Sequence, residues 1–526
     1  MTLALLLVCG AAVRLWQYLG RASLWLDELG LAASILNRPL RALLGEPFLF
    51  DQVAPPGFLA AVKGSVAVFG DGELALRLFP FLSSLVSLFL FAAVARRILD
   101  AIGALLGTAL FALGIPFVRY ASELKPYSTD VAVALLLSLV ALDLPDRNAS
   151  PRSYWKAGLV GAAAVWFSLP AVLVLAGLGT ALTIERLVRA GVRGVRPLLP
   201  TLGSWAAGAA AAVAWSFHRT TPATREVLLR YWAPAFPAIS WRNGFGAGFL
   251  LAYLQSFWGG PGMRYPWPPL FVALTLLGFA LSARTRGRSA LVLLGPIAVT
   301  FLASVARLYP FDGRLTLFLG PAFVLAAAAS ARFVMARLMR VRVPALATAT
   351  LLAFPALLAL ALHPPVYHHE ETRALFEQLA LRRQLGDAIY IFYGANQALR
   401  YYGPRSGIDP SQVTVGGCHR GDLAAYLREI DGFRGRSRVW ILIAHSQPRL
   451  KEQETIRAYC DRIGHRRESM ETPEEDRASS LELFDFSDSD PLAASSADTF
   501  PLPGIDLDLA RRLGCGRGPG GGNLGM

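Results

Sequence analysis

Long runs of apolar residues, separated by short connections, constrain the fold of this chain more than any other feature. Only 17% of its 526 residues are charged, whereas soluble chains carry about 25%, and its mean hydropathy is +0.43. About eleven runs have the length of membrane-spanning helices. They cover residues 2–19, 74–94, 101–118, 127–142, 157–183 (two runs, broken at Ser168-Leu169-Pro170), 198–217, 268–281, 291–305, 315–335 and 343–362.

Basic residues occupy every second connection between these runs. They are Arg96 and Arg97; Arg147, Arg152 and Lys156; Arg186, Arg189, Arg193 and Arg196; Arg284, Arg286 and Arg288; and Arg332, Arg337, Arg340 and Arg342. Cytoplasmic loops carry an excess of such residues. We therefore expect a multi-pass protein of the bacterial inner membrane with a cytoplasmic N-terminus. With an odd number of spans, its C-terminal part is expected in the periplasm.

The formal net charge of +14 does not indicate nucleic-acid binding. The arginines gather in the connections, and no basic stripe is interleaved with aromatic residues, as nucleic-acid binding would require. Membrane lipid is the environment that the composition predicts, and we expect no nucleic-acid partner.

Composition divides the chain into three regions. Residues 1–362 form the predicted all-α membrane domain, whose first outer loop spans residues 20–73 and contains a short apolar helix over residues 58–69. In residues 363–487, strands and helices alternate, which favours a small α/β domain with a mostly parallel sheet. The expected strands are 386–393, 412–416, 438–444 and 480–486, and the expected helices are 396–402, 422–430 and 452–463. Residues 488–526, rich in Ser, Asp, Pro and Gly, are predicted to be disordered.

The chain has four cysteines, and their spacing does not indicate a metal site. Cys418 and Cys460 lie in the predicted periplasmic domain. They form a disulfide there or remain two separate thiols, and the sequence leaves both possibilities open.

Two adjacent carboxylates, Asp27 and Glu28, follow the first apolar run. A membrane protein has little use for paired acids at this depth unless they contact water, a cation or a substrate. One interpretation makes them the solvated N-terminal turn of an interfacial helix, which the helix dipole favours. The other makes Asp27 a catalytic base.

Two further outer turns carry charges. The first has Arg119 before Ser122-Glu123-Leu124-Lys125-Pro126-Tyr127 and Asp130 after it, and the second is Tyr309-Pro310-Phe311-Asp312-Gly313-Arg314. Glu123 and Lys125 could simply pair or cap a helix, and Arg314 could be an interfacial anchor. Because an unpaired Asp130 would be costly within a span, we expect it to pair with Lys125 or Arg119.

Sugar transfer from a lipid phosphate would use all three turns. Cations stabilise the charge that the departing phosphate gains, and Lys125, Arg119 and Arg314 are candidates. A carboxylate must take the proton of the acceptor hydroxyl. Asp27 is the candidate, with Glu28 or Glu123 as a second acid that orients the acceptor or the base. A single displacement would invert the anomeric centre.

In these turns the chain resembles the GT-C superfamily of polytopic glycosyltransferases that use polyprenyl-phosphate sugars. It is most similar to the bacterial branch of protein O-mannosyltransferase-like and rhizobial galacturonosyltransferase-like enzymes. The matching residues are Leu26-Asp27-Glu28, Pro55-Pro56 with residues 58–69, residues 73–80, Glu123-Leu124-Lys125-Pro126-Tyr127, residues 309–314, and Gly386-Asp387 with Tyr401-Tyr402-Gly403. The resemblance implies that Asp27 is the catalytic aspartate and that Lys125 and Arg314 hold the lipid phosphate. Some members bind a divalent metal near the acidic pair and others need none. A metal therefore remains possible, although we expect no cofactor.

The expected activity is thus an inverting glycosyl transfer at the periplasmic face. The donor would be a polyprenyl-phosphate-linked sugar, and the acceptor a hydroxyl of a glycolipid, a polysaccharide or a protein. The alternative is a polytopic transporter or lipid flippase. A transporter would more often place charges or broken helices at the membrane midplane, whereas here the charges gather near one face. An envelope-assembly scaffold would leave the clustered acids unexplained.

Overall fold

The computed structural model describes residues 2–144, 150–240, 246–285, 287–338, 345–472, 479–489, 497–517 and 523–524. Two compact units emerge. Unit 1 comprises Met1–Arg21, Val53–Thr220 and Trp232–Tyr367, and unit 2 comprises Ala22–Gln52, Thr221–Tyr231 and His368–Met526. The chain therefore leaves unit 1 twice before its C-terminal part. Arg147, Arg286, Arg340 and Arg342 lie outside the described residues.

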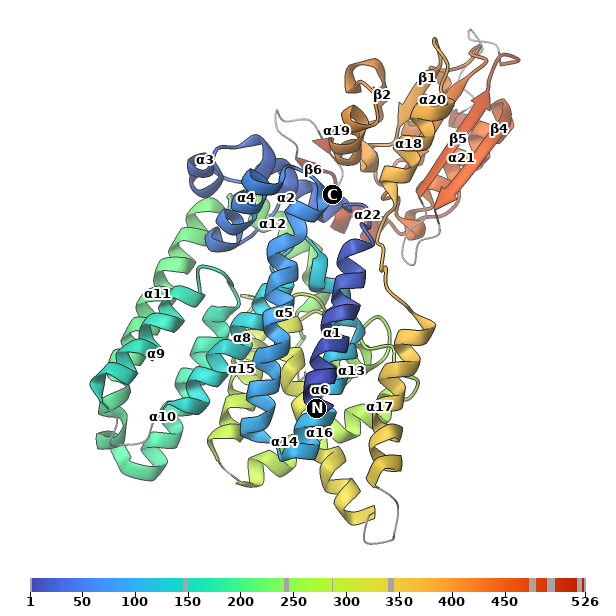
Figure 1. Ribbon diagram of the computed structural model, residues 1–526. Coiled ribbons are helices and arrows are strands. Elements are labelled where there is room, and N and C mark those ends of the chain that lie inside the picture. The colour runs from blue at the N-terminus through green and yellow to red at the C-terminus, as the bar shows by residue number, and fades with distance from the viewer. Residues whose placement is uncertain are drawn as a thin grey trace. The chain divides into compact units, whose positions relative to one another are not determined.

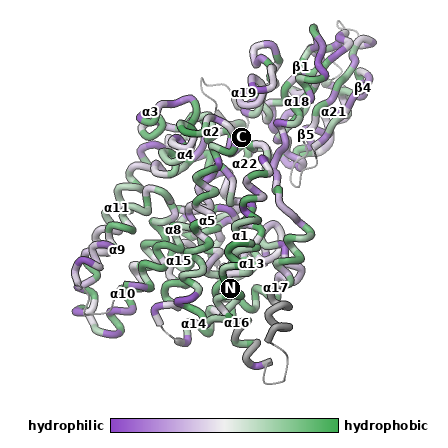
Figure 2. The backbone as a smooth tube through the Cα atoms, in the orientation of Figure 1, coloured by the Kyte–Doolittle hydropathy of each residue, from purple (hydrophilic) through white to green (hydrophobic). Residues whose placement is uncertain are grey.

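Unit 1 is helical, and each predicted apolar run is helical in it, although the run over residues 101–118 is divided into two helices, Ala101–Leu113 and Ile115–Arg119, that meet at a bend. The helices are α1 (Thr2–Leu19), α4 (Pro56–Phe69), α5 (Glu73–Ile98), α6 (Ala101–Leu113), α7 (Ile115–Arg119), α8 (Tyr127–Asp143), α9 (Pro151–Ala164), α10 (Ala171–Val195), α11 (Leu199–Arg219), α13 (Ala247–Trp258), α14 (Pro268–Thr285), α15 (Arg288–Val305), α16 (Gly320–Leu338) and α17 (Ala345–Leu362). The expected break at Pro170 separates α9 from α10. Figure 2 shows hydrophobic residues along most of these helices.

Length and hydropathy identify four membrane-spanning candidates among the described helices. They are α1, α5, the stretch Ala171–Arg219 and α15, and a fifth is added if the bent pair of α6 with Ile115–Ser122 counts as one span. Shorter apolar helices among the residues searched are Pro56–Phe69, which was expected to be too short to span, Pro268–Arg284 and Leu317–Ala331. The chain is a multi-pass membrane protein with a helical bundle, as the sequence predicts.

Ion pairs join the basic ends of several helices within the bundle. Arg288 at the start of α15 binds Glu185 of α10 at 2.9 Å and donates a hydrogen bond to the carbonyl of Leu144, just after α8. Arg97 at the end of α5 pairs with Asp143 at the end of α8. Four connections that the charge pattern assigns to one side of the membrane therefore come together at one end of unit 1.

A mixed sheet forms the core of unit 2. Its strands are β1 (Ala388–Ile391), β2 (Thr414–Val415), β3 (Val439–Ile443), β4 (His465–Thr472) and β5 (Ser479–Asp485), in the order β2-β1-β3-β5-β4. The helices of this unit are α2 (Leu26–Asn37), α3 (Leu40–Gly45), α12 (Pro222–Tyr231), α18 (Thr372–Arg382), α19 (Asn396–Arg405), α20 (Leu423–Asp431), α21 (Glu452–Ile463) and α22 (Leu507–Leu513). Two short strands, β6 (Gly516–Arg517) and β7 (Asn523–Leu524), pair separately. Figure 1 shows α18 and α19 beside β1.

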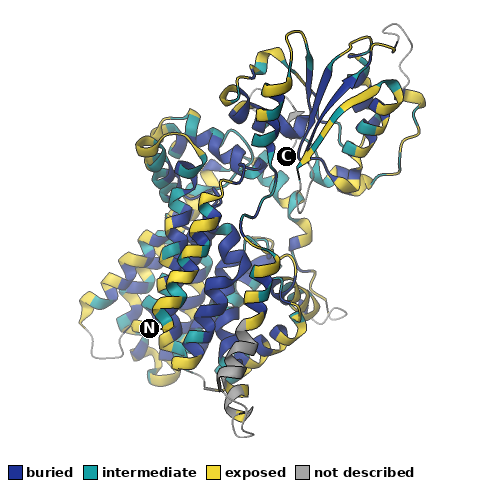
Figure 3. Ribbon diagram, turned by 45° about the vertical axis from the view of Figure 1, so that its right-hand side comes forward, coloured by how far each residue is buried: buried dark blue, intermediate teal, exposed yellow. Residues whose placement is uncertain are grey.

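The sheet corrects the expectation of mostly parallel strands. β1 pairs in parallel with β2 and β3, whereas β5 is antiparallel to both β3 and β4. The sequence analysis missed β4, because this polar, largely exposed edge strand lacks the alternation of apolar and polar residues that marks a half-buried strand. By contrast, all residues of β3 are buried, and Figure 3 shows the buried strands within unit 2.

A disulfide joins Cys418 to Cys515, and Cys460 is a buried free thiol. The possible bond between Cys418 and Cys460 is therefore wrong. Part of the segment expected to be disordered is folded, since α22 lies in it and the disulfide follows directly. The apolar face of α22 accounts for this order, because Leu509 and Ala510 pack with Leu450 in a small buried cluster.

Candidate functional site

The six predicted site residues divide between the two units. Asp27 and Glu28 belong to unit 2, and the others belong to unit 1. The residues of unit 1 are Arg119, Glu123, Lys125 and Arg314.

Asp27 and Glu28 have different surroundings at the start of α2. Glu28 is fully buried, and its carboxylate accepts a hydrogen bond from the backbone N–H of Trp25 at 3.4 Å. It thereby satisfies one of the amides that a helix start leaves without an intrahelical partner. Asp27 is half-buried between buried neighbours on both sides. Of the two acids, Asp27 is the one that a substrate can reach.

The segment before Asp27 is tied to residues that follow α17 along the chain. The backbone N–H and hydroxyl of Ser23 donate to the Glu371 carboxylate at 2.8 and 3.0 Å. Burial alone would raise the pKa of Glu371, but hydrogen bonds from His368 and Ser23 lower it below its usual value. Glu371 is therefore held as an anion that binds this segment.

The charged residues of unit 1 come from two turns that converge on Tyr120. Arg119 ends α7, Tyr120 lies in the short helix Tyr120–Ser122, and Arg314 lies between α15 and α16. The charges of Glu123, Arg119, Arg314 and Asp312 all act on the Tyr120 phenol. The two turns therefore act electrostatically on one residue, although 191 positions separate Glu123 from Arg314 along the chain (314 − 123).

Burial makes this cluster more than a solvated surface. Arg119, Glu123 and Lys125 are 8%, 5% and 6% exposed. The guanidinium of Arg314 lies 5.6 Å from the ring centroid of Trp232. Burying a charged side chain is costly unless it has a partner. The burial of three charged side chains in this turn therefore indicates a site that holds charged groups.

Asp130 does not pair as expected. Among the described residues, no ion pair joins it to Lys125 or Arg119, and its Oδ1 has no hydrogen-bond partner. Its charge acts on Tyr309 of the second turn. Burial raises the pKa of Tyr309, and the charge of Asp130 adds to this increase. Residues of the turn 309–314 therefore interact electrostatically with Tyr120, before the first charged turn, and with Asp130, after it.

Sequence reasoning missed the tyrosines of this cluster. Tyr120 and Tyr127 pack edge to face with ring centroids 5.3 Å apart. Tyr253 hydrogen-bonds Thr316 at 2.8 Å, and Tyr309 donates to the Leu315 carbonyl at 2.7 Å. Adjacency to Arg119 was the one available signal for Tyr120, because aromatic residues near a membrane surface are otherwise common.

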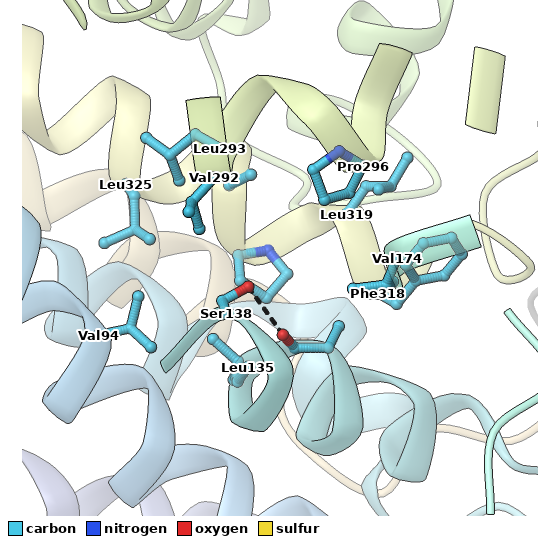
Figure 4. Close-up of a pocket in the computed structure, with 13 residues that line it drawn as sticks. Val94, Leu135, Ser138, Val174, Val292, Leu293, Pro296, Phe318, Leu319 and Leu325 are labelled. Carbon is cyan, nitrogen blue, oxygen red and sulfur yellow. Dashed lines mark hydrogen bonds between the residues drawn. The ribbon is translucent and has the colours of Figure 1, made fainter. Parts of the chain in front are cut away.

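A cavity of about 30 Å³ inside unit 1 lies apart from these residues. Figure 4 shows its lining, which is almost entirely apolar, and the Ser138 hydroxyl there donates to its own helix at the Ala134 carbonyl, at 2.8 Å. Such a volume holds about one water molecule, so this cavity does not accommodate a sugar. In the described part of the chain, no cluster of three or more His, Cys, Asp or Glu side chains has the arrangement of a metal site.

Comparisons with known proteins identify related folds. Residues 53–217 match the family model of dolichyl-phosphate-mannose-protein mannosyltransferases. A comparison with curated proteins gives no significant sequence match.

Solved structures resemble nearly the whole chain. ArnT from Cupriavidus metallidurans in the apo state is 16% identical with a TM-score of 0.51, and the alignment covers 91% of this chain and 97% of that one. Oligosaccharyltransferase AglB from Archaeoglobus fulgidus, in complex with an inhibitory peptide and a dolichol-phosphate, is 11% identical with a TM-score of 0.50, over 88% of this chain and 72% of that one. These similarities, together with the helical bundle and the terminal α/β domain, show that the chain has the fold of the GT-C superfamily of glycosyltransferases.

Proposed function

We propose that this chain transfers a sugar from a polyprenyl-phosphate donor to a hydroxyl acceptor. The observation that carries the proposal is the burial of Arg119, Glu123 and Lys125 in the turn around Tyr120, within a GT-C fold. The matched family is described as using dolichyl-phosphate-mannose, and the AglB structure contains a dolichol-phosphate. A glycolipid, a polysaccharide or a protein would supply the acceptor hydroxyl.

The proposed reaction is a single displacement. Asp27 takes the proton of the acceptor hydroxyl as its oxygen attacks the anomeric carbon. The bond between that carbon and the phosphate oxygen breaks, and the lipid phosphate leaves with the electron pair. Lys125, Arg119 and Arg314 stabilise the negative charge that the phosphate gains. The sugar is transferred with inversion.

Glu28 and Glu123 act as orienting acids in this scheme. Glu28 holds the first turn of α2 through the Trp25 amide, which fixes the backbone that carries Asp27. Glu123 lies within the electrostatic reach of Tyr120, as Arg119 does. A carboxylate there would keep the cations in place before the phosphate arrives. We propose no metal for the reaction.

Three observations support a periplasmic site. Segments 22–52, 221–231 and 368–526 share one unit, so the loops after α1 and α11 and the C-terminal part lie on one side of the membrane. Disulfides such as that between Cys418 and Cys515 persist in oxidising compartments, including the bacterial periplasm. The basic connections gather at a common end of the bundle. We propose an inner-membrane protein with a cytoplasmic N-terminus, a membrane domain over residues 1–362 and a periplasmic domain over residues 363–487.

The test is transfer of labelled sugar from a polyprenyl-phosphate donor in membranes that contain the native chain or Asp27→Asn. A general base contributes about 10²- to 10⁴-fold to rate, so we expect a loss of that size with donor binding retained. Asp508→Asn, whose side chain is 94% exposed on unit 2, is the matched control. Native turnover in Asp27→Asn would remove Asp27 from the mechanism. Substrate counterflow without glycoside formation would instead support a transporter or flippase.

A further inference from the structure

The sheet of unit 2 has a topological switch point. From β1 the chain passes through α19 to β2 on one side, and from β2 through α20 to β3 on the other side of β1. Open α/β sheets bind ligands in the crevice outside the carboxyl ends of the strands at such a point. In this sheet the crevice lies where β1 and β3 end.

A segment of the chain itself occupies this position. Gly394 follows β1, and a Cβ there would lie 2.5 Å from the carbonyl oxygen of Ala444, so the two loops approach closely. The next residue, His445, binds the carboxylate of Glu370 through Nδ1. His445 and Glu370 are 5% and 3% exposed. The segment 368–371, which we name the linker, is therefore held at the switch point by a buried pair.

The other side of the linker holds the residues before Asp27. Glu371 accepts both hydrogen bonds of Ser23, and the backbone N–H of Arg373 donates to the Ser23 hydroxyl at 3.1 Å. The rings of Trp25 and His369 stack with centroids 4.4 Å apart. Within the linker, Glu370 binds His445 at the crevice. The residues on either side of it, His369 and Glu371, contact the segment before Asp27.

Helix α19 supplies a second attachment. The hydroxyl of Tyr402 accepts a hydrogen bond from the buried backbone N–H of Leu24 at 2.7 Å. Helix α2 packs against α19. A Cβ at Gly30 would lie 3.3 Å from Gln397 Oε1, which shows how closely these two helices approach. The start of α2 is therefore held in two ways. One is α19, which follows β1, and the other is the linker, which binds His445 after β3.

We propose that the C-terminal α/β domain positions Asp27 by binding the Ser23–Trp25 segment through Glu371 and Tyr402, with its ligand crevice used to hold the linker. This inference rests on the proposed function of Asp27. Glu371 and Tyr402 are positioning residues, since they act on the reaction through the backbone of α2.

A short helix such as α2 needs tertiary contacts to fix its orientation. α2 has 12 residues, and isolated helices of roughly that length are marginal in water. Its orientation therefore depends on tertiary contacts. A misplacement of about 1 Å at a reacting group can cost about 10²-fold in rate, so loosening the segment should reduce turnover without removing the carboxylate.

The experiment compares Tyr402→Phe with Tyr459→Phe. Tyr459 is a buried tyrosine of the same unit whose hydroxyl bonds Asp431 at 2.5 Å, so both variants lose one tyrosine hydroxyl of unit 2. A net hydrogen bond corresponds to about a 2- to 12-fold change in an equilibrium or rate. We expect Tyr402→Phe to lower kcat by about that factor, with KM for the polyprenyl-phosphate sugar unchanged. Glu371→Gln should lower kcat further, and Tyr459→Phe should leave it native.

Hydrogen exchange of residues 22–37 provides a readout that does not depend on activity. Tyr402→Phe and Glu371→Gln should speed exchange in these residues and leave β1 and β3 protected, whereas Tyr459→Phe should change neither. Native exchange in residues 22–37, or equal kcat losses in Tyr402→Phe and Tyr459→Phe, would overturn the proposal. If the native chain transfers no sugar, the proposed function fails, whereas the exchange data still decide whether Glu371 and Tyr402 hold this segment.

Discussion

The two halves of the proposed site are built in opposite ways. In unit 1, Arg119 and Lys125 are buried in the turn around Tyr120, whereas Arg314 of the second turn is partly exposed beside Trp232. In unit 2, Asp27 lies in the first turn of a 12-residue helix, and the segment before it donates hydrogen bonds to the linker and to α19. The comparison teaches that the proposed phosphate-binding half owes its position largely to burial, whereas the proposed proton-accepting half depends on a separate unit. The two halves should therefore respond differently to perturbation.

Removal of the disulfide should give the largest difference between the responses of the two units. Replacing Cys418 and Cys515 by serine opens a link of 97 residues in unit 2. Such a link stabilises a fold by about 2–4 kcal/mol, so unit 2 should become sensitive to proteolysis at lower temperature. Binding of polyprenyl phosphate, which we propose unit 1 supplies, should stay native. Equal loss of both properties would mean that the halves are not separable.

Loss of a cation should give the converse result. Lys125→Gln removes a buried charge that we propose contacts the lipid phosphate, and hydrogen bonds to charged groups contribute about 1.5–3 kcal/mol. We expect polyprenyl phosphate to bind about 10- to 150-fold more weakly, as measured by its inhibition of transfer, with hydrogen exchange in α2 unchanged. Lys156→Gln, at an exposed position of α9, is the control. Native affinity in Lys125→Gln would refute its assigned role.

The two acids of α2 offer a finer distinction. Glutamine can replace glutamate in capping a helix start, so Glu28→Gln should keep transfer within about threefold. Glu28→Ala loses the cap and should destabilise the start of α2 by about 1 kcal/mol, measured as faster hydrogen exchange there. A loss in Glu28→Gln as large as that in Asp27→Asn would assign proton transfer to Glu28 instead.

The smallest expected effect is a pH dependence of unit 2. The pKa of Glu371 is lowered in the folded chain from its ordinary value of 4.5. The unfolded chain therefore binds more protons between the two values, so this contribution to stability is complete above pH 4.5 and is lost as pH falls through the folded pKa. Thermal unfolding of unit 2 in Glu371→Gln should show a flatter acid limb than the native chain. Glu377→Gln, with a side chain 59% exposed, should retain the native slope.

Much of the fold could be predicted because local pattern determines it. Apolar length marked most helices of unit 1, although α13 lies between two predicted runs and was missed. Pro170 marked the break between α9 and α10, and turn residues bounded β1, β3 and β5. β4 escaped because an exposed edge strand carries little hydrophobic signal. The antiparallel pairing of β5 was also not predicted, since alternation of strands and helices does not reveal that the strand direction reverses after β3.

The candidate site could be predicted only in parts. Residue types and membrane depth make Asp27, Lys125 and Arg314 candidates, because charges near a membrane surface are conspicuous, and their roles stay predictions. The pairing of Ser23 with Glu371 spans 348 positions, and no local period reports it. The Cys418–Cys515 bond was missed for the same reason, since it joins a loop to a tail whose composition suggested disorder.

The central claim is that an acid from unit 2 and cations from unit 1 act on a single lipid-linked sugar. Photo-cross-linking with a polyprenyl-phosphate sugar that carries a diazirine on its sugar ring tests this claim most directly. Mass spectrometry should locate adducts both in residues 22–37 and in residues 119–130 or 309–314, and excess polyprenyl phosphate should suppress both sets. Competed adducts in one unit alone would contradict the account.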